Sequence, residues 1–306
     1  MRKILLGNHY DSGSFAILQE CIPEGYELMQ LNDANQEALI NAVADADYLI
    51  ASGRLRIDSE VIGHAKRLRL VARTGVGLDT IDQDALRRAG IPLRVNSGVN
   101  AESVAEHALL LMLAALRRLP ETDQAVKRGL WPKRTLGITT HELSGKKVFV
   151  AGLGNIGRKV VQLLGVFGCE TLGSDHIERG KLPKEFFEAD IITLHCPLLP
   201  ETRHLIDEEV IARLKPGCII VNTARGGLID EEALAKGLRN GSIGFACLDV
   251  REQEPSNTPI PFDGLDNVIL TSHIAGITYE SFKSMLSGAV KNIVEFENST
   301  ACKQID

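Results

Sequence analysis

The chain has 306 residues, 44% of them hydrophobic and 24% charged, with a net charge of −6 spread over interspersed charges. This composition is typical of a soluble globular protein, and no basic stretch indicates nucleic acid or a membrane surface as a partner. The longest apolar run, Ala108–Leu116, is too short for a membrane span, which needs about 20 residues.

The six cysteines stand singly, with no CxxC pair among them. We therefore expect neither a metal site nor a disulfide framework. The apolar run within Met1–Gly7 is too short for a secretory signal. Reduced thiols and the lack of a signal sequence predict a cytoplasmic protein.

Through the first hundred residues, short apolar runs alternate with amphipathic stretches. The strands expected there are Lys3–Leu6, Glu27–Leu31, Tyr48–Ala51, Leu68–Ala72 and Leu93–Val95. The helices expected between them are Gly13–Cys21, Asn35–Ala44, Ser59–Ala65 and Ile81–Ala89. This alternation predicts a parallel sheet covered by helices on both faces.

One long helix is predicted at Asn100–Arg118. Its centre is apolar nearly all round, so we expect it to be buried between domains or between subunits. Pro120 and the segment Gly129–Pro132 then interrupt the pattern. A polar connector at Lys133–Ser144 leads to the second half of the chain.

A second strand and helix series begins at Lys147, with a strand at Val148–Ala151 and a helix at Arg158–Phe167. Further strands are expected at Thr171–Gly173, Ile191–His195, Cys218–Asn222, Gly244–Leu248 and Val268–Thr271, and a last amphipathic helix at Tyr279–Glu297. The predicted fold class is α/β, with doubly wound parallel sheets.

Between that strand and helix lies a glycine loop, Gly152-Leu153-Gly154-Asn155-Ile156-Gly157. This context is the one that a dinucleotide-binding loop requires, because the glycines allow a tight turn, approach of the pyrophosphate and close helix packing. Asp175 follows Gly157 by 18 residues and would accept hydrogen bonds from the adenosine ribose. A carboxylate there favours NAD over NADP, although Arg179 lies close in sequence.

Three segments that follow predicted strands offer a guanidinium, carboxylates and an imidazole: Asn222–Gly227, Asp249–Pro255 and Thr271–Gly276. Ligands of doubly wound sheets bind at these strand ends. The set suits hydride transfer to a 2-oxoacid, with Arg225 binding the carboxylate, His273 as general acid/base, and Glu254 raising the pKa of the histidine. Taken singly, each residue also fits a turn, a strand end or a solvated loop.

These segments are part of a resemblance that covers nearly the whole chain. The chain resembles the D-isomer-specific 2-hydroxyacid dehydrogenase family, in a short form that is 3-phosphoglycerate dehydrogenase-like or glyoxylate/hydroxypyruvate reductase-like. The motifs that carry the resemblance are Arg73–Asp79, Asn100–His107, Glu142–Lys146, Ala189–Leu198 and Leu214–Gly217, together with the glycine loop and the three segments above.

The resemblance implies two Rossmann-like or flavodoxin-like doubly wound domains with a cleft between them. The NAD-binding domain would span residues 99–279, and the substrate domain would be built from 1–98 plus 280–306. It also implies a homodimer formed through the NAD-binding domain, with the helix Asn100–Arg118 and the Trp131 arm at the interface.

The implied site residues agree with those found from the pattern. The NAD site would be formed by Gly152, Gly154, Asn155, Ile156, Gly157, Asp175, His195, Cys196, Pro197, Thr223, Ala224, Arg225, Asp249, His273, Ala275 and Gly276. The 2-hydroxyacid or 2-oxoacid would bind to Ser52, Gly53, Arg54, Gly75, Val76, Gly77, Arg225 and His273.

The chain departs from the family pattern at several positions. Ser52-Gly53 stands where phosphoglycerate enzymes often carry Arg-Ser, so a phosphorylated substrate is left open, with Arg54 and Arg56 as substitutes. Arg251 replaces a common Phe and Ser272 a usual Pro; both should adjust packing and leave the acid/base chemistry intact. We expect no feedback control through an appended regulatory domain.

Two alternatives to this enzyme class or substrate stay open. An NAD(H)-sensing interaction protein of the corepressor type keeps the same three side chains, but such proteins carry extra tails. Formate enzymes usually pair their histidine with Gln, and Glu254 argues against formate or phosphite here.

Overall fold

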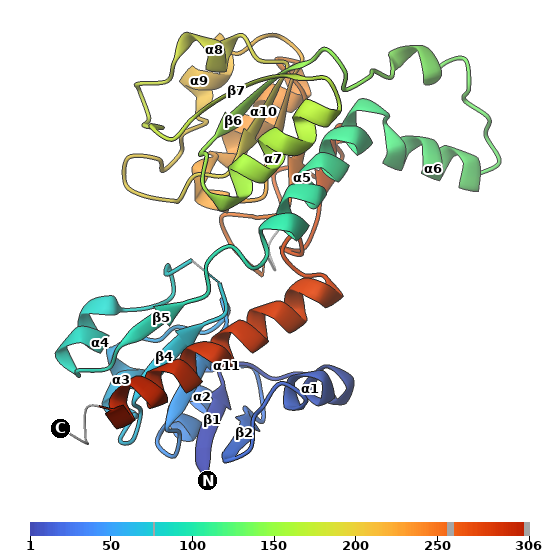
Figure 1. The fold of residues 1–306 in the computed structure, drawn as a ribbon. Coiled ribbons are helices and arrows are strands. Elements are labelled where there is room, and N and C mark those ends of the chain that lie inside the picture. Colours follow the sequence, from blue (N-terminus) through green and yellow to red (C-terminus); the bar gives the residue numbers. More distant parts are fainter. Residues whose placement is uncertain (76, 256–259, 303–306) are drawn as a thin grey trace. The chain divides into compact units, whose positions relative to one another are not determined.

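The computed structural model describes residues 1–75, 77–255 and 260–302. It divides into two compact units, one of Met1–Asn100 with Thr278–Asp306 and the other of Ala101–Ile277 (Figure 1). Val76, predicted to contact the substrate, lies outside the described residues. In the described part of the chain, no helix is long and apolar enough to cross a bilayer.

The first unit contains a five-stranded parallel sheet in the order β2-β1-β3-β4-β5. Its strands are β1 (Arg2–Leu6), β2 (Tyr26–Gln30), β3 (Tyr48–Ala51), β4 (Leu70–Arg73) and β5 (Leu93–Val95). Its helices are α1 (Ser12–Gln19), α2 (Gln36–Val43), α3 (Ser59–His64), α4 (Gln83–Arg88) and α11 (Tyr279–Cys302).

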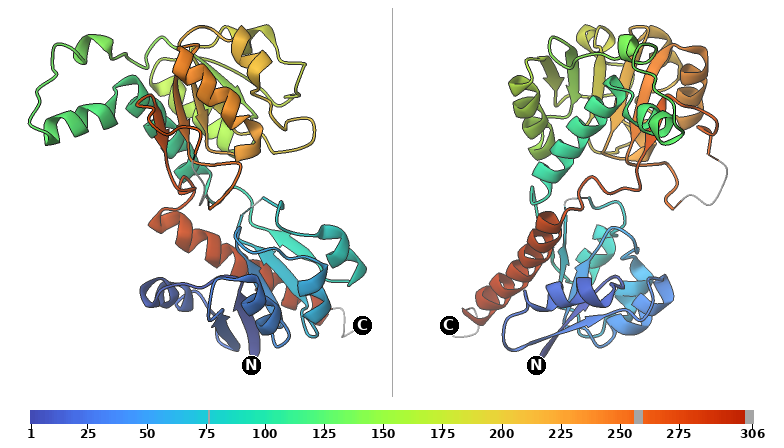
Figure 2. Two further views of the ribbon diagram at one scale, coloured as in Figure 1. Left: turned by 180° about the vertical axis from the view of Figure 1, so that it is seen from behind. Right: turned by 90° about the vertical axis from the view of Figure 1, so that its right-hand side faces the viewer.

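Side chains on alternate strand positions of this sheet enter two different cores. Ile4 and Leu6 pack with Leu286 and Ile293 of α11, whereas Leu5 packs with the helices on the opposite face. This alternation follows from the two-residue period of a strand, and both faces are covered. The two views in Figure 2 show α11 lying along one face of the sheet. The doubly wound architecture predicted for the first hundred residues is confirmed.

The second unit contains a six-stranded parallel sheet in the order β11-β10-β9-β8-β6-β7. Its strands are β6 (Lys147–Ala151), β7 (Glu170–Ser174), β8 (Ile191–Leu194), β9 (Cys218–Asn222), β10 (Ile243–Leu248) and β11 (Val268–Leu270). Its helices are α5 (Ala101–Leu116), α6 (Leu119–Lys127), α7 (Asn155–Val166), α8 (Lys184–Phe187), α9 (Glu208–Arg213) and α10 (Glu231–Asn240), with short 3-10 turns η1 (Gly137–Thr139) and η2 (Gly226–Leu228).

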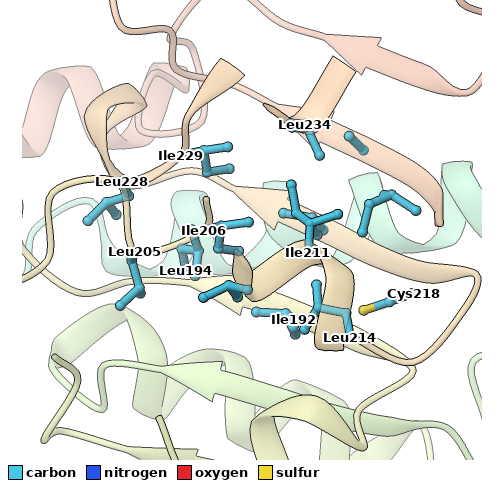
Figure 3. Packing of buried hydrophobic residues seen from close by; sticks show 14 of the residues in the cluster. Ile192, Leu194, Leu205, Ile206, Ile211, Leu214, Cys218, Leu228, Ile229 and Leu234 are labelled. Atoms are coloured by element: carbon cyan, nitrogen blue, oxygen red, sulfur yellow. The ribbon is translucent and has the colours of Figure 1, made fainter. Parts of the chain in front are cut away.

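In this sheet the chain begins at β6, adds β7 on one side and then continues through β8 on the other. Ligands of doubly wound sheets bind where the strand order reverses in this way, here between β6 and β8. One face packs on α5 and α7, and the other on α8, α9 and α10. Figure 3 shows the second of these cores, where Ile192 and Leu194 of β8 meet Ile211 of α9 and Leu234 of α10.

The segment that precedes this sheet shows two features that the sequence did not predict. The apolar centre of α5 packs within its own unit, where Ala108, Leu111 and Met112 join the core formed with α7, β9 and β10, while Leu110 stays 53% exposed. Pro120 does not merely interrupt the chain, because it stands in the first turn of α6. Proline is tolerated there, since its missing N–H has no helical acceptor.

Candidate active site

The predicted cofactor residues of the second unit gather at one edge of its sheet. Each group follows a strand. The glycine loop follows β6, Asp175 follows β7, and His195 follows β8. Likewise, Thr223 follows β9, Asp249 follows β10, and His273 follows β11. Because all six strands are parallel, their carboxyl ends lie at the same edge. The glycine loop and His195 flank the reversal of strand order between β6 and β8.

The glycine loop has the geometry of a phosphate-binding turn. Gly152 has φ +95°, a conformation that favours glycine, and a Cβ there would lie 2.7 Å from Cys196 N. A Cβ on Gly157 would lie 1.9 Å from the Gly152 carbonyl oxygen, whereas one on Gly154 would meet nothing within 4 Å. The space above Gly154 and the close approach of α7 therefore match two of the three glycine roles.

Helix α7 begins at Asn155 with Gly154 as its N-cap, and no side chain caps it. Its first N–H groups and its partial positive charge are consequently presented to the space above the loop. An anionic pyrophosphate fits this position well. Ile156 and Gly157 lie in the same first turn.

Asp175 lies just beyond β7, and its Oδ1 accepts a hydrogen bond of 2.5 Å from Leu153 N in the glycine loop. The carboxylate is thereby held beside the loop, as a ribose-binding residue requires. Arg179, which left the choice between NAD and NADP in doubt, instead pairs with Asp207 through contacts of 2.9 and 2.7 Å.

Two polar atoms at this edge are buried and have no hydrogen-bond partner among the described residues, His195 Nδ1 and Thr223 Oγ1. The other ring nitrogen of His195 lies 2.9 Å from Thr193 Oγ1. Burial lowers the pKa of His195 to about 4 and raises that of Cys196 to about 11, so both are neutral at pH 7. Buried polar atoms of this kind need a partner from outside the chain, and both atoms fit an NAD site, which offers hydrogen-bonding groups.

Arg225 follows β9 and is partly buried. Asn222 holds this turn, because its amide donates to the Arg225 carbonyl at 2.9 Å and its Oδ1 accepts from Ala224 N at 3.0 Å. The guanidinium donates to the Ala224 carbonyl at 2.7 Å. Its charge also reaches His273, where it opposes protonation of the imidazole.

Asp249 organises the loop that carries His273. The side chain is buried, and its two oxygens accept hydrogen bonds from Ile274 N and Ala275 N, both at 2.9 Å, and from the Thr271 hydroxyl at 2.6 Å. The Asp249 carbonyl accepts from His273 N at 2.8 Å. His273 adopts φ +57°, a left-handed conformation that these bonds hold in place. Gly276 ends this segment.

His273 and Glu254, which the sequence analysis expected to act as an acid/base pair, lie within hydrogen-bonding distance of each other. Nδ1 of His273 lies 2.5 Å from Glu254 Oε2. This hydrogen bond raises the pKa of His273 above its ordinary value against the opposing effect of burial. Burial raises the pKa of Glu254, but hydrogen bonds from His273 and Arg251 N outweigh it, so the net pKa is lowered. The imidazolium–carboxylate form is thus favoured.

Other residues of this site were not assigned a role from the sequence. His107 of α5 lies 3.2 Å from the Thr271 hydroxyl and 3.7 Å from Asp249 Oδ1. Gly226 and the pair Glu231 and Arg251 pack against the segment that carries Glu254. Gly226 and Arg251 had a local signal, because Gly226 directly follows Arg225 and Arg251 lies in the segment that carries Glu254. His107 and Glu231 are brought in by contacts distant in sequence.

In the first unit, the predicted substrate residues follow β3 and β4. Arg73, a buried residue not assigned a role from the sequence, holds both segments, because it donates to the Gly77 carbonyl at 2.8 Å and to the Ala51 carbonyl at 3.1 Å. A Cβ on Gly53 would lie 3.4 Å from the Arg73 guanidinium. Ser52 donates to the Gly7 carbonyl at 3.0 Å. Arg54 is exposed, and Gly75 lies between Arg73 and Gly77.

Comparison with known proteins matches the second unit to an established family. The family model described as "D-isomer specific 2-hydroxyacid dehydrogenase, NAD binding domain" matches residues 109–275. A D-3-phosphoglycerate dehydrogenase of Methanocaldococcus jannaschii is 40% identical over 301 residues, which cover 93% of this chain and 55% of that protein. The chain thus spans about half the length of the phosphoglycerate dehydrogenases that it matches.

Two further similarities extend over nearly the full length of both partners. A glyoxylate reductase of Aeropyrum pernix is 36% identical over 309 residues, covering 92% of this chain and 91% of that protein. The crystal structure of an NAD-dependent formate dehydrogenase from Staphylococcus aureus in complex with NAD superimposes with a TM-score of 0.83 at 28% identity, covering 98% of this chain and 96% of that one.

Proposed function

The chain belongs to the D-isomer-specific 2-hydroxyacid dehydrogenase family, with NAD as its cofactor, and from that premise we propose that it interconverts a D-2-hydroxyacid and its 2-oxoacid. The observation that carries this proposal is the 2.5 Å hydrogen bond between His273 and Glu254, at the same sheet edge as the glycine loop. Reduction of a 2-oxoacid needs a proton donor beside the carbonyl oxygen, and this pair supplies one.

His273 is the general acid/base in this proposal. Because Nδ1 bonds to Glu254, Nε2 is the nitrogen that would face the substrate oxygen. The raised pKa favours the protonated ring, which reduction of the oxoacid needs. In the oxidative direction, the neutral ring would take the hydroxyl proton and the imidazolium would be stabilised by Glu254.

Arg225 would bind the substrate carboxylate through its planar fork of N–H donors. The same cation would stabilise negative charge on the substrate carbonyl oxygen. From the first unit, we propose Ser52, Gly53, Arg54 and the segment 75–77 as further substrate contacts. The substrate side chain is left open, and phosphorylated and unphosphorylated oxoacids are both candidates.

NAD, when bound, would supply the hydride acceptor or donor at C4 of its nicotinamide ring. The first turn of α7 and the glycine loop would hold the pyrophosphate, and Asp175 the adenosine ribose. His195, Cys196, Pro197, Thr223, Ala224, Asp249, Ala275 and Gly276 are proposed to line the rest of the NAD site. The unpaired Thr223 hydroxyl and His195 nitrogen are available as donors or acceptors there.

His273→Ala tests the proposed chemistry. It should lose most turnover with any 2-oxoacid that the enzyme accepts, yet keep NADH affinity measured by fluorescence titration. His64→Ala, an exposed histidine of α3, is the matched control and should change neither quantity. Turnover near the normal value in His273→Ala would remove His273 from its role.

We also propose a homodimer formed through the second unit. Helix α6 buries none of its side chains, and the segment that follows it leaves Leu130 60%, Trp131 79% and Ile138 84% exposed. Exposed apolar side chains in such number mark an interaction surface. Light scattering should give twice 33.3 kDa, and Trp131→Lys should weaken the dimer. A monomer at micromolar concentration would refute this assembly.

The location that we propose is the cytoplasm. Cys21, Cys169, Cys196, Cys218 and Cys247 are all free thiols in the structure. Free thiols are typical of proteins from a reducing compartment.

A further inference from the structure

A buried ion pair lies directly behind the segment that carries Glu254. Glu231 is the first residue of α10. Arg251 donates to both of its carboxylate oxygens, from Nε to Oε1 at 2.8 Å and from Nη2 to Oε2 at 2.7 Å. The two side chains are only 11% and 13% exposed. Such a two-pronged contact fixes the orientation of both groups as well as their distance.

The same pair holds the backbone on either side of Arg251. Glu231 Oε1 also accepts a hydrogen bond of 2.9 Å from Glu252 N, and Arg251 N donates to Glu254 Oε1 at 2.6 Å. One oxygen of Glu254 therefore takes its position from Arg251, while the other bonds to His273. The chain of contacts runs from Glu231 to the imidazole without a gap.

Two more contacts leave Arg251 little freedom to move. The guanidinium lies over the Phe262 ring at 5.1 Å from its centre. On the backbone side, Gly226 approaches so closely that a Cβ there would lie 1.9 Å from the Arg251 carbonyl carbon. The Arg251 guanidinium is thus occupied by Glu231 and Phe262, and its role differs from that of Arg225.

We propose that Glu231 and Arg251 are positioning residues, which hold the Glu254 carboxylate against Nδ1 of His273. This inference rests on the proposed role of His273 in acid/base chemistry. A phenylalanine at position 251 would have no group that could pair with Glu231.

The most direct readout is the pKa of His273, measured by NMR titration of labelled histidine and assigned with His273→Ala. The charged groups that act on this imidazole are Glu254 and Asp249, which raise its pKa, and Arg225, which lowers it. In Glu231→Gln, the pKa should fall toward the ordinary histidine value of 6.5, because the neutral amide pairs more weakly with Arg251 and so holds Glu254 less firmly. The NMR titration needs no substrate, so it stands even if no oxoacid is turned over.

Turnover gives the second readout. Misplaced acid/base groups cost about 10- to 100-fold in rate. Glu231→Gln should therefore lower kcat by that factor, with the Kd for NADH within about twofold, since the glycine loop is untouched. Glu252→Gln is the matched control: Glu252 pairs with the exposed Arg203 and with His204, and its loss should leave kcat and the His273 pKa near their normal values.

A double variant separates positioning from stability. Glu231→Leu with Arg251→Met replaces the pair by apolar side chains of similar size, which commonly preserves stability. The double variant should therefore fold with a near-normal Tm. Because it lacks the acceptor for Glu252 N, it should still show the lowered His273 pKa and the lowered kcat. A His273 pKa and kcat at normal values in the folded double variant, or in Glu231→Gln, would overturn the proposal. So would a change confined to KM, which would make Arg251 a substrate contact.

Discussion

Two adjacent buried glycines of η2 should respond very differently to the same substitution. In Gly226→Ala, the new Cβ would lie 1.9 Å from the Arg251 carbonyl carbon and 2.3 Å from Glu252 N, whereas ordinary contact begins at 3.4 Å. The Arg251–Glu252 peptide must therefore move by about 1.5 Å. In Gly227→Ala, the nearest atoms are a Leu198 methyl at 3.0 Å and the Arg203 guanidinium at 3.5 Å, both at ends of flexible side chains.

The displacement gives the expected magnitude for Gly226→Ala. A shift of that size breaks the 2.9 Å bond from Glu252 N to Glu231. Overpacking and the loss of a hydrogen bond to a charged acceptor together cost about 2–5 kcal/mol. Gly227→Ala should change the free energy of unfolding by less than about 1 kcal/mol.

Urea titration followed by circular dichroism measures both values, and NMR titration of His273 shows whether Glu254 has moved. Gly226→Ala should be the less stable variant and should have the lower His273 pKa. Equal stability and equal His273 pKa values in the two alanine variants would refute the reasoning, because the contact with Arg251 would then not hold this loop.

Three further predictions concern the cofactor loop and the acid/base pair. Gly157→Ala places a Cβ 1.9 Å from the Gly152 carbonyl oxygen and should weaken NADH binding at least ~10-fold in a fluorescence titration; unchanged affinity would contradict the loop assignment. Asp175→Ala should reduce the preference for NADH over NADPH, and an unchanged ratio of the two Kd values would remove Asp175 from that role. Glu254 stabilises the fold fully above its ordinary pKa of 4.5, and this stabilisation is lost as the pH falls through its lowered pKa. His273 stabilises the fold fully below its ordinary pKa of 6.5, and this stabilisation is lost as the pH rises through its raised pKa. Glu254→Gln should therefore reduce the free energy of unfolding most between pH 4.5 and pH 6.5. The loss should be less than about 1 kcal/mol, because the His273 side chain is 52% exposed. A loss of stability that does not depend on pH would contradict the pairing.

The parts of the fold that sequence patterns predicted are those with a short-range signal. Strands β3 and β9 lie at their predicted bounds, because each contains four consecutive apolar residues that end at polar or turn residues. The three-residue strand β5 also lies at its predicted bounds. Helix α6 was missed, since Pro120 was taken as an interruption when it is also a good first-turn residue. Short helices such as α8, with four residues, carry too little periodicity to be recognised.

The candidate site divides in the same way. Arg225, Glu254 and His273 could be singled out because each is a chemically distinctive residue after a strand, and parallel strands bring such positions to one edge. Glu231 could not, because an acidic residue in the first turn of a helix is as expected for helix electrostatics as for a buried ion pair. Its partner Arg251 lies 20 residues away, and only the folded chain shows that they meet.

The central claim is NAD-dependent reduction of a 2-oxoacid, and NADH absorbance at 340 nm tests it most directly. The full chain, NADH and a panel of glyoxylate, hydroxypyruvate, pyruvate, branched oxoacids and phosphohydroxypyruvate would be followed for loss of absorbance. At least one oxoacid should oxidise NADH with a rate that falls in His273→Ala, and the preferred one would name the substrate side chain. Tight NADH binding without oxidation by any member of the panel would contradict the claim and favour an NAD(H)-sensing role.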